Sequence, residues 1–198
     1  AYVAWAAVWV SSARGAGNRT AGAARSPYAL RAHGTTSAVV LPTVHKLSAD
    51  ALFAAARERG MRLVTGKVLM DRHAPDGLRD DVDQAARDCV DLIDRWHGVD
   101  RLAYAVTVRF APTSTPEQLR MAGQLCTSYP GVFMQTHLSE NKQEVAWVKE
   151  LFPDARSYLD VYDQAGLLNA CSVFAHGIWL DDEDRRALAD AGAQIAHS

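Results

Sequence analysis

The sequence predicts an α/β protein, a partial (βα)8 barrel of the TIM type with about strands two to seven present. Six apolar runs alternate with amphipathic stretches, and such near-continuous apolar strands are typical of a parallel sheet covered by helices. A doubly wound sheet fits the same alternation. However, it usually carries a glycine-rich turn after its first strand, and no GxGxxG or GxxxxGK[ST] motif occurs in this sequence. The barrel is therefore favoured.

The first predicted elements follow an irregular start of the chain. Residues 37–41 (SAVVL) are apolar and form a buried strand. Residues 50–59 have the composition of a helix, which Gly60 ends. Residues 62–70 form the next apolar strand, which we expect to be continuous.

The middle of the chain repeats this order. Residues 78–97 form a long helix with its apolar side chains on one face, and Gly98 follows it. Residues 102–110 form a strand. Residues 115–128 form a helix whose second residue, Pro116, suits a first helical turn.

The last third of the chain holds shorter elements of the same two kinds. We expect its strands at residues 132–136, 172–175 and 194–196. We expect its helices at residues 141–151, 157–165 and 181–191.

Composition excludes several classes of protein. Hydrophobic residues make up 48% of the 198 residues and charged residues 22%, which excludes a disordered or collagen-like chain. The formal net charge of −2 provides no basic field for nucleic acid. The longest apolar run, residues 1–10, has about half the length of a bilayer span, so we expect no membrane partner.

The three cysteines, Cys89, Cys126 and Cys171, are widely spaced. They form no CxxC pair, which excludes a cysteine zinc knuckle and argues against a disulfide scaffold. We therefore expect a reducing compartment and a cytoplasmic protein.

The two ends of the sequence differ from the rest. Residues 1–27 form an irregular segment rich in Ala, Gly and Arg, interpreted as disordered or non-native, the alternative being a basic arm for an anionic partner. The regular pattern begins near Tyr28, so we expect residues 28–198 to form the partial barrel domain. The chain stops directly after an apolar strand, and we expect it to be a fragment at both ends.

Candidate functional residues follow the predicted strands, where barrels carry their catalytic groups. His137 and His176 follow consecutive strands and predict a metal site, although either histidine alone could be structural. Glu140 could act as general base and then acid, or could simply stabilise the start of the next helix. Arg109 could anchor a polar substrate or form a salt bridge at the rim.

Three stretches resemble strand signatures of the metal-dependent amidohydrolase superfamily, namely residues 134–141 (MQTHLSEN), 174–177 (FAHG) and 194–198 (QIAHS). Within the superfamily the resemblance is to the guanine deaminases. It rests on residues 33–36 (HGTT), 66–72 (GKVLMDR), 109–114 (RFAPTS) and 158–162 (YLDVY). The likeness covers most of the chain, from about residue 30 to its end.

The resemblance implies a barrel that holds one zinc ion, or iron, and deaminates guanine hydrolytically to xanthine and ammonia. His137 and His176 match two metal ligands, and Glu140 matches the residue that moves the proton. Arg109 and Phe110, together with His137 and Glu140, match positions that contact the purine, a small-molecule substrate. Dimers are usual in the family, so a homodimer is expected.

The family's His-x-His pair occurs nowhere in this sequence, and its aspartate ligand is not visible either. Because a catalytic zinc needs three or more protein ligands, we expect the chain to be inactive alone. Two alternatives stay open. One is a deaminase or chlorohydrolase for another purine, pterin or triazine ring, and the other is a non-catalytic remnant.

Overall fold

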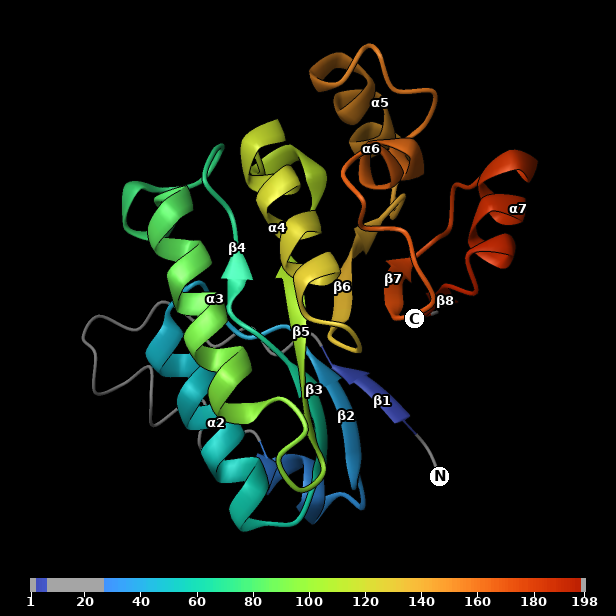
Figure 1. Ribbon diagram of the computed structural model, residues 1–198. Coiled ribbons are helices and arrows are strands. Elements are labelled where there is room, and N and C mark those ends of the chain that lie inside the picture. The colour runs from blue at the N-terminus through green and yellow to red at the C-terminus, as the bar shows by residue number, and fades with distance from the viewer. Residues whose placement is uncertain (1–2, 7–26, 197–198) are drawn as a thin grey trace. The chain divides into compact units, whose positions relative to one another are not determined.

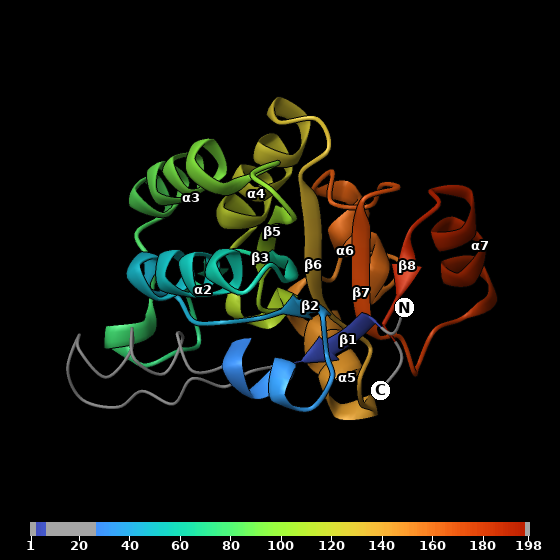
Figure 2. The same cartoon turned by 90° about the horizontal axis from the view of Figure 1, so that it is seen from below.

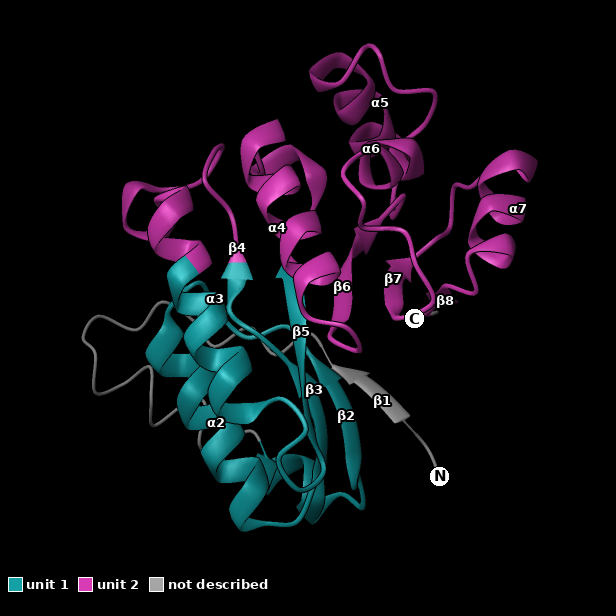
Figure 3. Ribbon diagram, in the orientation of Figure 1, with its two compact units in different colours: residues 1–68, 87–107 teal, residues 69–86, 108–198 magenta. Residues whose placement is uncertain are grey.

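The computed structural model describes residues 3–6 and 27–196, which fall into two compact units (Figures 1 and 3). Unit 1 comprises residues 1–68 and 87–107, and unit 2 comprises residues 69–86 and 108–198. The predicted irregular segment falls mostly outside the described residues. The domain boundary near residue 28 therefore stays a prediction.

Unit 1 contains a parallel sheet. Its strands are β1 (Val3–Ala6), β2 (Ser37–Val40), β3 (Arg62–Thr65) and β5 (Leu102–Val108), whose last residue belongs to unit 2. β2 pairs in parallel with β1 and with β3, and β3 pairs in parallel with β5. Strand β1 was not among the predicted strands; the other three confirm the expected parallel arrangement.

Helices α2 (Lys46–Glu58) and α3 (Val82–Trp96) lie side by side in both views (Figures 1 and 2). The ring of Phe53 stacks on Trp96 of α3 at 5.6 Å and on Tyr104 of β5 at 6.3 Å. All three side chains are buried, so this aromatic stack is part of the core between helices and sheet. Asp50 joins the two helices by accepting a hydrogen bond of 2.7 Å from the indole of Trp96.

Two predicted elements of unit 1 have different bounds. The strand expected over residues 62–70 is interrupted after Thr65 and resumes as β4 (Val68–Leu69). The interruption lies at Gly66, where an added Cβ would come within 1.9 Å of the Ala105 carbonyl oxygen. Helix α2 begins four residues earlier than expected, at Lys46, and buries Ser48 and Ala49.

The long helix expected over residues 78–97 begins only at Val82. A 3-10 turn, η1 (Asp76–Leu78), precedes it. The carboxylate of Asp81 accepts the backbone N–H of Gln84 at 2.8 Å, which fixes the helix start. The apolar pattern alone did not show where this cap would lie.

Unit 2 contains a second parallel set of strands, β6 (Phe133–Leu138), β7 (Ser172–His176) and β8 (Gln194–Ile195). Its helices are η2 (Ala111–Thr113), α4 (Pro116–Ser128), α5 (Lys142–Leu151), α6 (Tyr158–Gln164) and α7 (Asp182–Asp190). These bounds confirm the elements predicted for the last part of the chain to within two residues.

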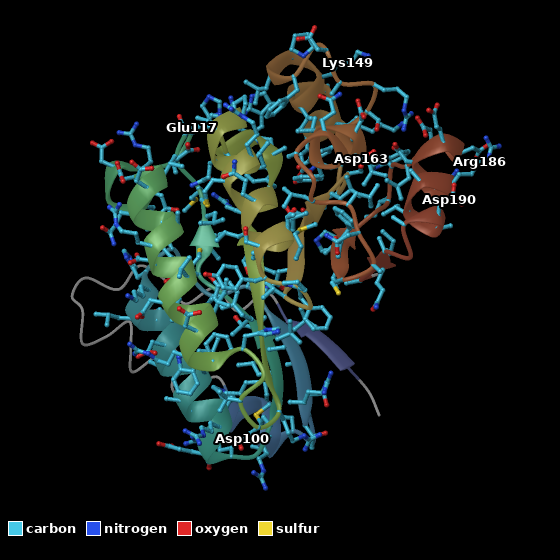
Figure 4. The ribbon with its side chains drawn as sticks, in the orientation of Figure 1. Asp100, Glu117, Lys149, Asp163, Arg186 and Asp190 are labelled. Carbon is cyan, nitrogen blue, oxygen red and sulfur yellow. The ribbon has the colours of Figure 1, made fainter. Side chains whose placement is uncertain are left out.

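Helices α4 to α7 start in the same way. A polar side chain directly before each helix accepts the backbone N–H three residues later, the caps being Thr115, Asn141, Ser157 and Asp181. Such caps satisfy N–H groups that the helix itself leaves unpaired. Outside the core, the labelled side chains of Lys149, Arg186 and Asp190 lie on α5 and α7 (Figure 4) and are exposed. Within the described ranges, no helix has the length and apolar character that crossing a membrane requires.

Candidate metal and substrate site at the ends of β6 and β7

Two histidines meet at the carboxyl ends of neighbouring strands in unit 2. β6 and β7 are parallel, with His137 opposite Ala175 and Leu138 opposite His176. The ring centroids of His137 and His176 are 5.8 Å apart, with their planes inclined by 44°. One metal ion with bonds of about 2.1 Å to nitrogen can join two imidazoles at such a separation. The predicted pair is therefore brought together by the strand register.

The Arg109 carbonyl orients the imidazole of His137. This oxygen lies 2.7 Å from Nδ1 of His137 and also accepts the His137 backbone N–H at 3.2 Å. A carbonyl only accepts hydrogen bonds, so the proton is on Nδ1 and the lone pair is on Nε2. Burial is the main cause that lowers the pKa of His137, which favours the neutral ring that a metal requires.

Glu140 lies two residues beyond β6, in a turn that brings its carboxylate close to His176. Its Oε1 is 3.7 Å from Nε2 of His176, and 48% of the Glu140 side chain is exposed. Ser139 adopts a left-handed backbone conformation with φ of 50°, and its carbonyl accepts the Trp179 N–H at 3.0 Å. The next residue, Asn141, caps α5, so Glu140 also stands just before a helix start, as its structural interpretation expects.

Arg109 and Phe110 follow β5 and lie in unit 2 with the histidines. The guanidinium carbon of Arg109 is 5.2 Å from the Phe110 ring centroid, and Nη1 is 3.6 Å from Sδ of Met70. Burial lowers the pKa of Arg109, yet a guanidinium keeps its charge at neutral pH. The Arg109 guanidinium and the Phe110 ring therefore provide a cation and an aromatic face on the segment that is hydrogen-bonded to His137.

Two aromatic residues near Phe110 escaped sequence reasoning. Trp147 on α5 meets Phe110 edge to face at 6.1 Å, and His73 lies 5.3 Å from Trp147. Nδ1 of His73 is 2.7 Å from the Pro112 carbonyl. Trp147 lies within α5, so the strand-end rule could not find it. His73 lies four residues beyond β4 and was overlooked, because only the residues directly after that strand were considered. The residues that flank His73 and Trp147 in the sequence form no motif that marks a functional site.

Three further titratable residues have structural partners or lie outside the described residues. Asp71 accepts hydrogen bonds from the backbone and hydroxyl of Thr115, at 2.8 and 2.5 Å. His97 accepts the Tyr104 N–H at 3.2 Å in unit 1. His197 lies outside the described residues.

The donor set fits part of a metal site. His137 presents a nitrogen lone pair next to His176, and imidazole nitrogen suits zinc and iron alike. Among residues 3–6 and 27–196, no group of three or more His, Cys, Asp and Glu is placed to hold an ion. The described residues thus supply two neighbouring imidazoles that could bind an ion, with a carboxylate beside them.

Comparison with known proteins shows clear relatives. The model of the amidohydrolase family matches residues 21–198. Guanine deaminase of Escherichia coli (strain K12) is 50% identical over 164 residues, which cover 83% of this chain and 37% of that protein. A probable guanine deaminase of Deinococcus radiodurans is 39% identical over 170 residues, covering 86% of this chain and 39% of that protein.

Solved structures agree with the sequence matches. E. coli guanine deaminase superposes with a TM-score of 0.88 at 47% identity, covering 90% of this chain and 42% of that one. Guanine deaminase from C. acetobutylicum, with bound guanine in its active site, gives a TM-score of 0.84 at 28% identity, covering 91% and 46%. The chain thus spans about two fifths of the length of these relatives. The likenesses confirm the predicted α/β fold, a partial (βα)8 barrel.

Proposed function

Because the chain belongs to the amidohydrolase family, we propose that it serves the zinc-dependent hydrolytic deamination of guanine to xanthine and ammonia, a step of purine catabolism. One observation carries this proposal. The imidazoles of His137 and His176 and the carboxylate of Glu140 meet where β6 and β7 end. Similarity to guanine deaminases of two bacteria supports guanine as the substrate.

His137 and His176 hold the zinc ion in this proposal. The Nδ1–H of His137 is committed to the Arg109 carbonyl, so Nε2 is the atom that binds. When bound, zinc lowers the pKa of a coordinated water and so supplies a nucleophile near neutral pH. Iron is the alternative ion for the same nitrogen donors.

Glu140 moves the protons of the reaction. Its half-exposed carboxylate, 3.7 Å from His176, is placed to accept a proton from the attacking water. It delivers this first proton to a nitrogen of the purine ring. It then takes the second proton from the added hydroxyl as the new carbonyl forms, and gives it to the departing amino group, which leaves as ammonia when its C–N bond breaks. One carboxylate thus acts first as base and then as acid.

Arg109 and Phe110 bind and orient the purine. The guanidinium donates hydrogen bonds to the ring carbonyl oxygen, and burial strengthens these bonds by excluding water. The ring of Phe110 covers one face of the purine, and Trp147 supports Phe110 from its edge. A flat substrate with a carbonyl acceptor suits this pair.

A chimera tests the proposal. The stretch of E. coli guanine deaminase that matches this chain over 164 residues is replaced by the corresponding residues of the chain. We expect the zinc-loaded chimera to release ammonia from guanine with a kcat/KM at least about a hundredfold above that for pterin or triazine amines. The chain by itself should stay at background, since its sequence lacks a His-x-His pair.

A folded, zinc-loaded chimera that leaves guanine untouched would overturn the proposal. Preference for a triazine or pterin would mean that the substrate is another ring, hydrolysed by the same chemistry. Ammonia release by the chain alone would show that two imidazoles suffice.

We also propose that the protein acts in the cytoplasm on a free purine. All three cysteines of the sequence, Cys89, Cys126 and Cys171, lie among the described residues and form no disulfide bond, as is usual in a reducing compartment. The resemblance to guanine deaminases further supports a homodimer, which light scattering of the chimera would test by its mass.

A further inference from the structure

The segment of residues 158–162 (YLDVY) forms most of helix α6, and nothing proposed so far uses it. Four of its five side chains are buried, those of Tyr158, Leu159, Val161 and Tyr162. The following residue, Asp163, is exposed on the outside of α6 (Figure 4). Tyr162 therefore points inward from a helix that has charged residues on its other side.

The hydroxyl of Tyr162 reaches the backbone of the site. It donates a hydrogen bond of 2.8 Å to the carbonyl oxygen of His137. It accepts the backbone N–H of Ala111 at 2.9 Å and the hydroxyl of Thr136 at 3.0 Å. A phenol has one donor and two acceptor positions, so all three are used.

These bonds join the two segments that carry the site. His137 is the second-last residue of β6, and Ala111 lies two residues after Arg109, whose carbonyl orients the His137 imidazole. Tyr162 is fully buried, and burial raises the pKa of its hydroxyl, which therefore keeps the proton it donates. Its ring is held in turn between Tyr158 at 5.6 Å and Phe174 of β7 at 5.8 Å.

We propose that Tyr162 is a positioning residue: its hydroxyl clamps the His137 backbone to the Ala111 backbone and so keeps the His137 imidazole on the Arg109 carbonyl. The proposal gives Tyr162 no contact with substrate or metal. Its role rests on the proposed function of His137 as a ligand, whose Nε2 would be available to an ion while Nδ1 is held. Tyr162, the last residue of the segment 158–162, thereby links this segment to the site.

Replacing Tyr162 by Phe tests the clamp with little change in volume. The substitution removes the hydroxyl that accepts the buried Ala111 N–H and that donates to the His137 carbonyl oxygen. In the 198-residue chain, NMR measures the exchange of the Ala111 amide and of the Nδ1–H of His137. Both should exchange at least about tenfold faster, and the imidazole should lose its single Nδ1–H tautomer.

Tyr104→Phe is the matched control. Tyr104 is equally buried but lies on β5 in unit 1, seven residues before Ala111, and its hydroxyl makes none of the three hydrogen bonds of the clamp. It should leave both exchange rates at the site unchanged. Amides of α4 in the same spectra report whether unit 2 as a whole has loosened.

Unchanged exchange at Ala111 and His137 in Tyr162→Phe would overturn the proposal. So would acceleration shared equally by the amides of α4, since that indicates general destabilisation. If Tyr162→Phe does not fold, Thr136→Val decides, because it removes one of the three bonds and should accelerate the same two protons less strongly. The spectra need neither metal nor guanine, so failure of the proposed deamination leaves this test intact.

Discussion

The orientation of His137 depends on a backbone atom 28 residues earlier in the chain. Its Nδ1 and its own N–H both meet the Arg109 carbonyl. The sequence identifies His137 because histidine follows an apolar strand, but the choice of tautomer depends on a neighbouring segment. Arg109 thus contributes in two ways, through its carbonyl to the histidine and, as proposed, through its guanidinium to the substrate.

Arg109→Lys separates these two contributions. The substitution keeps the backbone carbonyl but replaces the planar guanidinium, which can donate two parallel hydrogen bonds, by a compact ammonium group. In the chimera we expect KM for guanine to rise about 10- to 100-fold, the loss of a charged hydrogen bond, while zinc content stays the same. Steady-state kinetics with metal analysis measures both. Loss of zinc together with unchanged KM would contradict the division of roles.

The first and last residues of the helices and strands depend on particular side chains, which the periodic pattern of apolar residues reveals only in part. The caps of α4 to α7 were predictable, because a polar residue stands directly before each amphipathic stretch. The interruption of the strand at Gly66 was not, since it depends on the approach of Ala105 from β5. Sequence patterns report local preferences, whereas close contacts between elements need the fold.

Gly123 tests this distinction. It lies within α4, where alanine would normally favour the helix by about 1 kcal/mol. An added Cβ would instead come within 1.8 Å of the Ala165 carbonyl at the end of α6. We expect Gly123→Ala to lower the free energy of unfolding by about 1–3 kcal/mol. Denaturant unfolding should show no such loss for Gly77→Ala, where the space is open.

The junction of α6 and α7 predicts a pH dependence. Arg156 pairs with Asp181, Glu183 and Asp184. The Asp184 backbone N–H, and then Arg156, lower the pKa of Asp181. A lowered folded pKa gives stability that is present above the ordinary carboxyl pKa of about 3.9 and is lost as pH falls through the folded value.

Asp181→Asn should therefore flatten the acid side of the stability curve, since asparagine keeps the cap but carries no charge. Asp182→Asn, which changes a neighbouring exposed carboxylate, is the control and should retain the slope. Urea unfolding between about pH 2.5 and 6 measures both variants. An unchanged slope in Asp181→Asn would contradict the assignment.

At the scale of the whole molecule, the sequence predicted a parallel α/β fold and the strands that carry the site. It did not predict β1, whose short run gives no strong periodicity, nor the division into two units. His137, Glu140 and His176 could be predicted because they come directly after or soon after the predicted strands, although the structure extends β6 and β7 to include both histidines. The clamp by Tyr162 could not, because residue 162 reaches His137 through a helix that packs against the strands.

The most direct test of the account is Glu140→Gln in the chimera, with zinc content and ammonia release measured together. Glu140 is proposed to move protons beside the two histidines and not to hold the ion. We therefore expect one zinc per chain as in the parent chimera, with guanine deamination reduced by about 10²- to 10⁴-fold. Loss of zinc would make Glu140 a ligand, and retained turnover would remove it from the reaction; either result contradicts the account.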